Sequence, residues 1–263
     1  MEKKFERNLY IKDAHLYDLD NRYLLKADIP FYIDFAAKNK GPILELASGT
    51  GRVTIPLAEA GNEMWGIELS ETMIEQFKSK LKKLPRETVN RVHLIKGDMS
   101  NFKLEQKFPL VIIPYRSFQV LQDENLENAC LQGIYNHMTD DGYFIITLGN
   151  FAKVADREWE KDDEVFDWEN IDPQTGYNVR RTHRKKGIDK TNQVVHIQKT
   201  YYITKGNELI DKISKEISAK YFFENQIKER LSYKGFKIID EMGSYDGKPI
   251  TEGTEFIFMC QKK

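Results

Sequence analysis

Residues 42–52 read Pro-Ile-Leu-Glu-Leu-Ala-Ser-Gly-Thr-Gly-Arg, and this stretch decides the fold that we predict. A short apolar run, typical of a strand, ends in the turn Gly49-Thr50-Gly51, and a helical pattern follows from Val53 to Ala60. The two glycines allow backbone angles that a side chain would forbid, and they let the backbone come close to a ligand. The helix directs its free N–H groups and the positive end of its dipole at that turn. The unit therefore predicts either a nucleotide-type site within an alternating α/β sheet or a plain tight turn.

The residues after this turn alternate between strand and helix patterns. Glu68 ends the second predicted strand, and Ser70 is suited to cap the helix that follows it. Successive strand–helix units favour a parallel sheet whose ligands bind at the carboxyl ends of the strands. The predicted strands cover residues 62–68, 91–96, 110–113 and 143–148, and the helices cover residues 70–84 and 123–137.

Both ends of the chain add to this sheet. Residues 22–38 show the spacing of an amphipathic helix that Pro30 interrupts. Residues 222–234 read as another helix, and residues 236–242 and 254–261 read as the last two strands. The complete prediction is an α/β fold with a seven-stranded, mostly parallel sheet and helices on both faces.

The pattern changes in the second half of the chain. An acidic segment, residues 156–172, is followed by strand patterns separated by turns at residues 187–190 and 205–207. This arrangement predicts an antiparallel sheet inserted into the α/β domain, with strands over residues 177–186, 193–204 and 208–220. We therefore divide the chain into an N-terminal helical cap segment (1–40), an α/β core (41–152), the inserted sheet (153–220) and a C-terminal helix and strands that complete the core sheet (221–263).

The composition excludes several classes of protein. Lys and Arg number 40 and Asp and Glu number 41, so the chain has no overall field for a polyanion. Cys130 and Cys260 form no CxxC pair, and no cluster of His, Cys and carboxylates has the spacing of metal ligands. The first residues lack an apolar signal core, and no run reaches the about 18 apolar residues of a membrane helix. We expect a cytoplasmic protein that uses neither a metal nor a membrane.

Basic residues gather in one of the strands predicted for the insertion. One interpretation is an RNA-binding strand; the other is a solvated strand face beside the equally acidic preceding segment. Few aromatic residues interleave with these charges, so the second interpretation is favoured. The basic residues are Arg180, Arg181, His183, Arg184, Lys185 and Lys186.

Taken together, the strand tips resemble those of the class I S-adenosylmethionine-dependent methyltransferases. Residues 44–52 resemble the family's first motif, in which Gly-x-Gly lies under the methionine moiety. Glu68 resembles the acidic residue that binds the ribose, and Gly97-Asp98-Met99 resembles the motif that meets the adenine. Residues 112–119 stand where the family's fourth motif passes the sulfonium. The resemblance implies a Rossmann-like fold with S-adenosylmethionine as its cofactor.

The same resemblance implies a set of cofactor-binding residues, drawn from the N-terminal segment and from the four motifs. It covers about residues 40–150, and the two terminal strands also match the family's usual ending. The implied residues are Tyr17, Glu45, Ala47, Gly49, Thr50, Gly51, Arg52, Glu68, Leu69, Met73, Gly97, Asp98, Met99, Pro114 and Phe118.

Some positions depart from the family or separate it from a rival. Ala47 stands where the family usually has Gly, and Pro109 stands where it often has Asp. Because alanine is small, the backbone can still approach the cofactor at Ala47. A nicotinamide dehydrogenase would need a third glycine after the turn to pack helix and strand around a pyrophosphate, but Thr54 occupies that position. The absence of this third glycine disfavours a dinucleotide as the cofactor.

For the acceptor, three hypotheses stay open. Ile113 precedes Pro114-Tyr115, so this tip lacks the Asp or Asn with which DNA, RNA and protein amide methyltransferases hold a planar amine. The inserted sheet is instead similar to the lid of small-molecule methyltransferases, such as glycine and sugar-amine N-methyltransferases, in which it can also carry dimer contacts. The first hypothesis is therefore N- or O-methylation of a small molecule, in a monomer or a homodimer. The alternatives are an RNA or protein methyltransferase that uses residues 180–186 and a catalytically silent S-adenosylmethionine-binding protein.

In-line methyl transfer mainly requires alignment of the acceptor and exclusion of water. The sequence nominates no general base, and we expect His137 and His183 at the surface. The residues expected near a small-molecule acceptor are Tyr17, Tyr115, Arg116, Gln119 and Tyr245.

Overall fold

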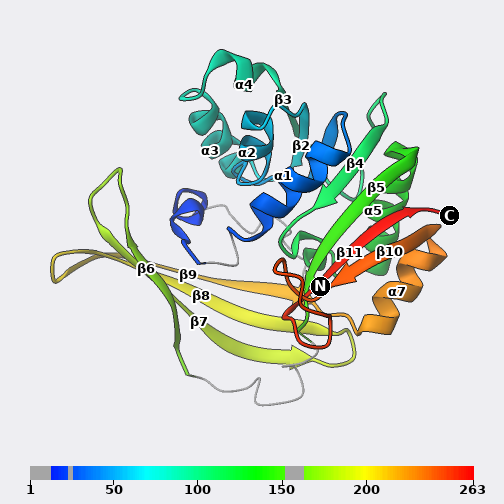
Figure 1. Ribbon diagram of the computed structural model, residues 1–263. Helices are drawn as coiled ribbons and strands as arrows, with labels where there is room; N and C mark the ends of the chain where they lie inside the picture. Colours follow the sequence, from blue (N-terminus) through cyan, green and yellow to red (C-terminus); the bar gives the residue numbers. More distant parts are fainter. Residues whose placement is uncertain (1–12, 23–25, 152–162) are drawn as a thin grey trace.

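Two β-sheets form the framework of the chain (Figure 1). The computed structural model describes residues 13–22, 26–151 and 163–263. A seven-stranded sheet with helices on both faces makes up the core, and a separate four-stranded antiparallel sheet lies beside it. This architecture confirms the predicted fold class. Parts of the predicted cap segment (1–40) and of the acidic segment (156–172) lie outside the described residues.

The core elements alternate along the chain as the sequence predicts. The first half holds the 3-10 helix η1 (Ala14–Leu19), α1 (Asp28–Lys38), β1 (Ile43–Leu46), α2 (Thr54–Glu59), β2 (Met64–Glu68), α3 (Glu71–Leu81), α4 (Arg86–Asn90) and β3 (Val92–Lys96). The second half of the core holds β4 (Phe108–Ile113), the 3-10 helix η3 (Ser117–Val120), α5 (Glu124–His137), β5 (Met138–Gly149), α7 (Glu224–Tyr233), β10 (Phe236–Met242) and β11 (Glu255–Lys262).

The order of strands in the core sheet is β10-β11-β5-β4-β1-β2-β3. Only β11 runs antiparallel to its neighbours β5 and β10, so the sheet is mostly parallel. The chain therefore starts in the middle of the sheet at β1 and winds outward in both directions. The carboxyl ends of β1 and β4 meet at the point where the strand order reverses, which is where open α/β sheets bind ligands.

The two faces of this sheet bury separate apolar cores. On one face, Tyr32 of α1 and Leu57 of α2 pack against strand residues such as Ile112. On the other face, Ile134 of α5 and Leu231 of α7 pack against a second set of strand residues. Successive strand residues point to opposite faces, so the continuously apolar runs of β1 and β4 supply both cores.

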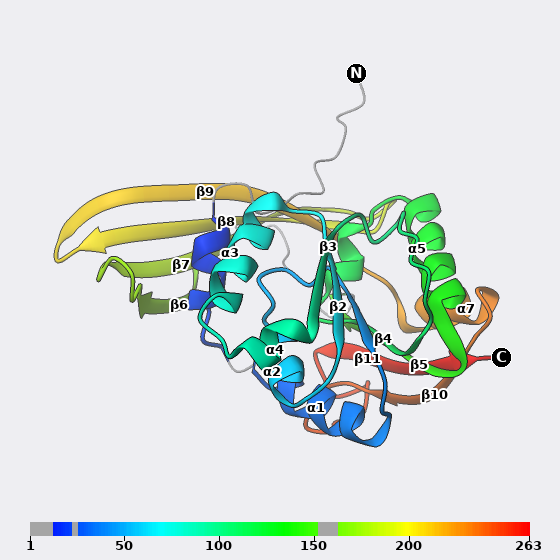
Figure 2. The same cartoon turned by 90° about the horizontal axis from the view of Figure 1, so that it is seen from above.

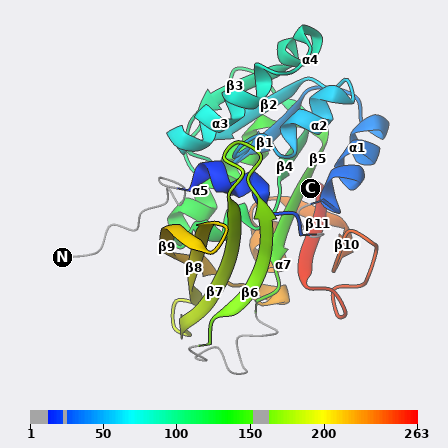
Figure 3. The ribbon, with the colours of Figure 1, turned by 90° about the vertical axis from the view of Figure 1, so that its left-hand side faces the viewer.

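The inserted sheet has one strand more than predicted. Its order is β6-β7-β8-β9, and it consists of β6 (Val165–Ile171), β7 (Asn178–Asp189), β8 (Val194–Lys205) and β9 (Glu208–Lys220). The additional strand, β6, has acidic residues among its apolar ones, which hides its strand pattern in the sequence. Figures 2 and 3 show the curved sheet with η1, in blue, between it and the core.

Several predicted boundaries differ from those observed. α1 begins at Asp28 and not at Arg22, so Pro30 falls in its first turn, where no intrahelical N–H is needed, and does not interrupt it. α3 ends at Leu81, and the short helix α4 follows where the sequence predicts none. The predicted turn at residues 187–190 is partly strand, because β7 continues to Asp189 through a register shift between Lys185 and Gly187.

Candidate active site

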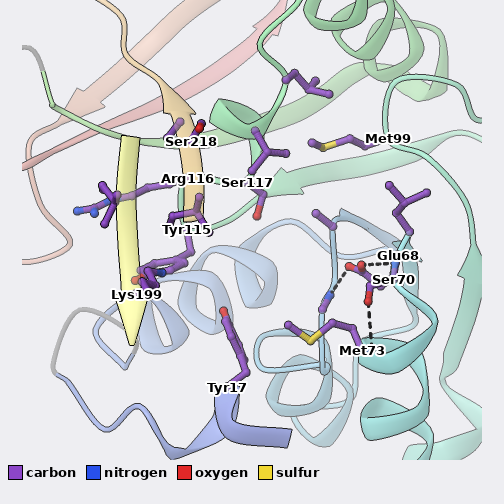
Figure 4. A pocket seen from close by; sticks show the side chains of 18 of the residues that line it. Tyr17, Glu68, Ser70, Met73, Met99, Tyr115, Arg116, Ser117, Lys199 and Ser218 are labelled. Atoms are coloured by element: carbon purple, nitrogen blue, oxygen red, sulfur yellow. Dashed lines mark hydrogen bonds between the residues drawn. The ribbon is translucent and has the colours of Figure 1, made fainter. Parts of the chain in front are cut away.

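A cavity of ≈ 420 Å³ lies between the carboxyl ends of the core strands and the inner face of the inserted sheet. This volume falls within the range of about 300–1,000 Å³ that is typical of small-molecule sites. Figure 4 shows the cavity with Glu68, Ser70 and Met99 on one side and Lys199 and Ser218 on the other. One half is therefore built by the core sheet, and the other half by the insertion.

The glycine turn after β1 forms the floor of the core half. Gly49 lines the cavity at φ +58°, and a Cβ there would find no heavy atom within 4 Å, so the backbone is open to a ligand. Its N–H donates to Glu68 Oε2 at 2.8 Å, and the N–H of Ser70 donates to Glu68 Oε1 at 2.8 Å. The Glu68 carboxylate is thus held in one orientation at the cavity wall, and burial raises its pKa.

The tips of β2 and β3 supply the apolar part of this half. Leu69, Met73 and Met99 line the cavity beside Gly97 and Asp98. Asp98 Oδ1 accepts hydrogen bonds from Ser100 N at 2.9 Å and Ser100 Oγ at 2.8 Å, which fixes the carboxylate at the rim. Apolar side chains beside a fixed carboxylate suit a ring that carries a hydrogen-bond donor.

The helix η1 covers one side of the cavity, between the core and the inserted sheet. Its Tyr17 points into the cavity, as Figure 4 shows, and burial raises the pKa of its hydroxyl, which therefore stays protonated. The neighbouring Asp18 ties η1 down: Oδ1 accepts from Thr50 Oγ1 at 2.7 Å, and Oδ2 accepts from Lys80 Nζ at 2.8 Å. Thr50 belongs to the glycine turn, so these bonds hold η1 directly against the turn that forms the floor of the cavity. We call the bonds of Asp18 with Thr50 and Lys80 the latch.

The tip after β4 is strained. Tyr115 and Arg116 are consecutive non-glycine residues with positive φ, 47° and 63°. Arg116 stays in this conformation because its N–H donates to the Thr147 carbonyl at 3.0 Å and its guanidinium forms an ion pair with buried Glu255. The turn presents the Tyr115 ring to the cavity, with the guanidinium carbons of Arg52 and Arg116 at 5.6 and 5.8 Å from its centroid.

Eleven of the residues predicted to bind the cofactor or the acceptor line this cavity. They come from η1, from the glycine turn, from the first turn of α3 and from the tips of β2, β3 and β4, which the topology brings to one edge of the sheet. They are Tyr17, Ala47, Gly49, Glu68, Leu69, Met73, Gly97, Asp98, Met99, Tyr115 and Arg116.

Other candidates from the first motif do not line the cavity, because each has a partner elsewhere. Glu45 is buried in the sheet, where it accepts a hydrogen bond from Thr54 Oγ1, and burial raises its pKa to about 8. Arg52 forms a bidentate pair with Asp28, at 2.7 and 2.6 Å. Thr50 is engaged in the latch to η1. Gly51, at φ +79°, lies so close to Phe77 that a Cβ would overlap the ring.

The remaining candidates also lie outside the cavity. Pro114 and Phe118 are buried, and Phe118 packs within the core. Gln119 is expected near the acceptor, but its amide is used to join backbones: it bonds to Gly149 and to the Lys220 carbonyl. Tyr245 is also expected there, but it packs in the apolar core on the α1 and α2 face of the sheet. Its hydroxyl forms a hydrogen bond with Thr147 Oγ1 at 2.6 Å.

The prediction of a surface position is wrong for His137. His137 is buried, since its Nε2 accepts from the Leu104 N–H at 2.9 Å and its Nδ1 bonds to the Gly133 carbonyl. His183 lines the cavity, paired with Asp167 at 2.9 Å. Among residues 13–22, 26–151 and 163–263, no group of three or more His, Cys, Asp and Glu side chains could hold a metal ion.

The insertion supplies cavity residues that the sequence did not single out for the site. Arg181, His183 and Lys185 of β7 point inward, whereas Arg180 and Lys186 lie exposed on β7. The alternation of strand residues splits the basic run in this way, but the register that places it over the cavity depends on pairing within the insertion. Asp167 of β6 and the neighbouring Arg22 were missed for the same reason, and Lys199 of β8 carried no motif.

Comparison with known proteins agrees with this geometry. Residues 43–142 match a family model described as "Methyltransferase domain". Over 233 residues, 88% of each chain, the sequence is 24% identical to the putative methyltransferase YqeM of Bacillus subtilis (strain 168). The matched residues form a methyltransferase domain, so this chain is an S-adenosylmethionine-dependent methyltransferase with the class I fold. Its cofactor is therefore S-adenosylmethionine.

Two further relatives of this methyltransferase are informative. The structure of the CcbJ methyltransferase from Streptomyces caelestis superimposes with a TM-score of 0.80 at 18% identity, over 98% of this chain and 99% of CcbJ. This likeness extends the shared fold to the inserted sheet. A dTDP-3-amino-3,4,6-trideoxy-alpha-D-glucopyranose N,N-dimethyltransferase of Streptomyces venezuelae is 25% identical over 161 residues, 59% of this chain and 65% of that enzyme. In the part of the chain that the structure describes, no helix has the length and apolarity to span a membrane.

Proposed function

We propose that this methyltransferase acts on a nitrogen or oxygen of a small-molecule acceptor, held between the cofactor half of the cavity and the inserted sheet. The observation that carries the proposal is the shape of the cavity. Its two halves are continuous, and the insertion and η1 cover it, so the space beyond the cofactor half suits a compact molecule. Residues 153–220 then act as a lid, and residues 1–40 as a cap.

The core half of the cavity fits S-adenosylmethionine. We propose that Glu68 accepts hydrogen bonds from the ribose hydroxyls, since its oxygens are aligned by two N–H groups and retain further acceptor capacity. Asp98 would accept from the adenine amino group, with Leu69 and Met99 along the ring. The open backbone at Gly49 would adjoin the methionine moiety. When bound, the cofactor supplies an electrophilic methyl group on a cationic sulfonium.

The protein residues contribute alignment and exclusion of water. Tyr17 closes the cavity from η1, and Tyr115 offers an aromatic wall of the kind that stabilises a cation. The ion pair between Arg116 and Glu255 keeps the tip that carries Tyr115 rigid. A fixed, dry site lowers the barrier to in-line transfer by orienting the reactants rather than by proton chemistry.

Nitrogen is the favoured acceptor atom. The Streptomyces venezuelae relative is an N,N-dimethyltransferase of an amino sugar nucleotide. That relationship supports an amine acceptor here, at the level of a shared scaffold. An amine must reach the methyl group unprotonated, and the basic residues around the insertion half favour the neutral form by electrostatic repulsion of an ammonium ion.

The proposal of an RNA or protein acceptor has less support. Arg181 pairs with Asp20 and Asp167, and Arg184 pairs with Glu164, so two of the cations are neutralised locally. Binding of a nucleic acid through this strand would weaken steeply with salt, because each phosphate contact releases counterions. An RNA or protein acceptor would also require that activity be lost in a triple variant in which Arg180, Arg181 and Arg184 are each changed to Gln. Retained S-adenosylhomocysteine binding in this variant would show that it folds.

The test is to incubate the protein with methyl-labelled S-adenosylmethionine and a cell extract, and then to separate small molecules, RNA and protein. Label in the small-molecule fraction supports the proposal, and the mass of the product identifies the acceptor. Label in RNA or protein contradicts it. No label in any fraction, with cofactor binding intact across several extracts, supports the silent cofactor-binding protein instead.

A further inference from the structure

Lys199 is an unusual residue for its position in β8. Side chains alternate along a strand, so Val195, Ile197, Lys199, Tyr201 and Ile203 share one face. The other four are apolar or aromatic, and the lysine stands in the middle of them. A sheet face of this composition ordinarily packs against a core, and an ammonium group there loses much of its hydration.

The Lys199 side chain reaches the cavity and meets no partner there. It lines the cavity, and Figure 4 places it on the same side as Ser218, across from Glu68. Within the described ranges of the chain, its ammonium group makes no hydrogen bond or ion pair. Burial, together with the nearby positive charges of Arg181 and Lys215, lowers the pKa of Lys199 to about 7.

The surrounding cations are already compensated. Across the sheet, Lys199 stands opposite His183 on β7 and Lys215 on β9. His183 pairs with Asp167, and Lys215 pairs with Asp13. Since these carboxylates are paired with other side chains, Lys199 has no ion-pair partner of its own among the residues that the structure describes.

Arginines next to this lysine add to the same field. Arg22 and Arg181 both line the cavity, and they share Asp20 and Asp167 as their acidic partners. Two carboxylates thus serve two guanidinium groups and His183, and the charge of Asp167 acts on Lys199 without forming an ion pair with it. A desolvated positive site of this kind binds an anion favourably, because the anion restores the missing partner.

We propose that the acceptor of this methyltransferase carries an anionic group, a carboxylate or a phosphate, and that Lys199 binds it. This inference rests on the proposed function and narrows it to acidic small molecules. The anionic group would lie against β8 and β9, so the methylated atom lies elsewhere in the acceptor, toward the core half. Lys199 is then a specificity-determining residue rather than a base.

The test measures anion binding without turnover. Protein saturated with S-adenosylhomocysteine is titrated by calorimetry with malonate in one series and with inorganic phosphate in another, at a pH of about 6.5, where the lysine is mostly charged. The variants are Lys199→Gln, which removes the charge, and Lys199→Arg, which keeps it. Lys186→Gln is the matched control, because Lys186 is an exposed lysine of the adjacent strand β7.

We expect one of the two anions to bind the wild type and to bind Lys199→Gln about tenfold more weakly, as for loss of one charge-assisted hydrogen bond. Lys199→Arg and the control Lys186→Gln should bind within about twofold of the wild type. The anion that binds tells whether the group is a carboxylate or a phosphate. Binding of neither anion, or equal binding by Lys199→Gln and the wild type, overturns the inference.

This readout separates the inference from the proposed function. If the extract experiment labels RNA or protein, the proposed function fails whatever the calorimetry gives. If a labelled small molecule is found and is neutral or cationic, the proposed function stands and the inference fails. Retained S-adenosylhomocysteine binding in each variant shows that the fold is intact.

Discussion

The backbone N–H of Gly49 donates a hydrogen bond to the carboxylate of Glu68, 2.8 Å away. This bond joins the glycine turn after β1 to the tip of β2, so the floor and the wall of the cofactor half are positioned by one interaction. Both groups also face the cavity. A change at Glu68 therefore alters the cavity wall and loosens the turn at the same time, and under the proposed function it also removes a contact with the cofactor.

We expect Glu68→Ala to weaken S-adenosylhomocysteine binding by about 1–3 kcal/mol, because ribose hydroxyls that lose a buried acceptor are left unpaired. Calorimetric titration measures the change, and Glu71→Ala, at an exposed position three residues along the chain, is the control. Glu68→Gln should retain part of the affinity, since its amide oxygen still accepts from Gly49. An unchanged Kd in Glu68→Ala would show that the carboxylate does not bind the cofactor.

The latch between η1 and the glycine turn predicts an effect on cofactor release. Asp18→Asn weakens the contacts with Thr50 and Lys80, so the cover with Tyr17 opens more often. We expect the Kd of S-adenosylhomocysteine to rise about 3–10-fold, as for the loss of about one partly exposed hydrogen bond. Stopped-flow measurement should place this change in the dissociation rate. The same Kd in Asp18→Asn and in the exposed control Asp34→Asn would contradict the latch.

The sequence predicts the site residues whose positions depend on local turns and strand ends, but not those whose positions depend on long-range strand pairing. Gly49, Glu68 and Asp98 lie at strand ends or in the turns directly after them, and strand order alone brings them to one edge of the sheet. Lys199 and Asp167 reach the cavity through the register of the inserted sheet and through its placement over the core, and neither leaves a local pattern. Glu45 shows the converse. A carboxylate near the end of β1 suggests a ligand contact, but the Glu45 side chain is buried in the core and accepts a hydrogen bond from Thr54.

Gly51→Ala is expected to destabilise the fold. A Cβ at this position would overlap the Phe77 ring, and φ of +79° disfavours any side chain. Gly176→Ala is the matched control, because Gly176 has φ of +72° but no heavy atom within 4 Å of a Cβ. The free energy of unfolding, measured with urea, should fall by about 1–3 kcal/mol more in Gly51→Ala than in the control. Combining Gly51→Ala with Phe77→Leu should recover part of the difference; equal losses in both alanine variants would exclude the overlap.

Glu45 predicts a pH dependence of stability. Its pKa is raised to about 8 in the folded protein, mainly by burial, above its ordinary value of 4.5. A group with a raised folded pKa stabilises fully below its unfolded pKa, and this stability is lost as the pH rises through the folded pKa. Between pH of about 5 and 8, the wild type should therefore lose on the order of 1–3 kcal/mol that Glu45→Gln keeps.

Thermal unfolding across this pH range provides the measurement for Glu45. Glutamine preserves the acceptor for Thr54 Oγ1, so the variant should fold, and its Tm should exceed that of the wild type at the alkaline end. Glu59→Gln, at an exposed position of α2, should follow the wild-type slope. Parallel slopes for wild type and Glu45→Gln would mean that this carboxyl ionises normally.

The binding of anions at Lys199 should also depend on pH, with a sign opposite to that of a general base. The lowered pKa, about 7, means that Lys199 loses its positive charge as the pH rises above neutrality. The affinity for malonate or phosphate should therefore fall with rising pH, by up to about tenfold per unit above the pKa. A general base would instead become active over the same range.

The other charged groups around Lys199 are Arg22, Arg181, His183, Lys215 and Asp167. The arginines stay protonated throughout this range, so the profile has to be assigned between Lys199 and its neighbours His183 and Lys215. Lys199→Arg should bind with a nearly flat profile because the guanidinium keeps its charge, and His183→Gln should keep the wild-type profile. A profile that persists in Lys199→Arg but disappears in His183→Gln would assign the titration to the histidine, and the pH dependence would no longer support an anion on Lys199.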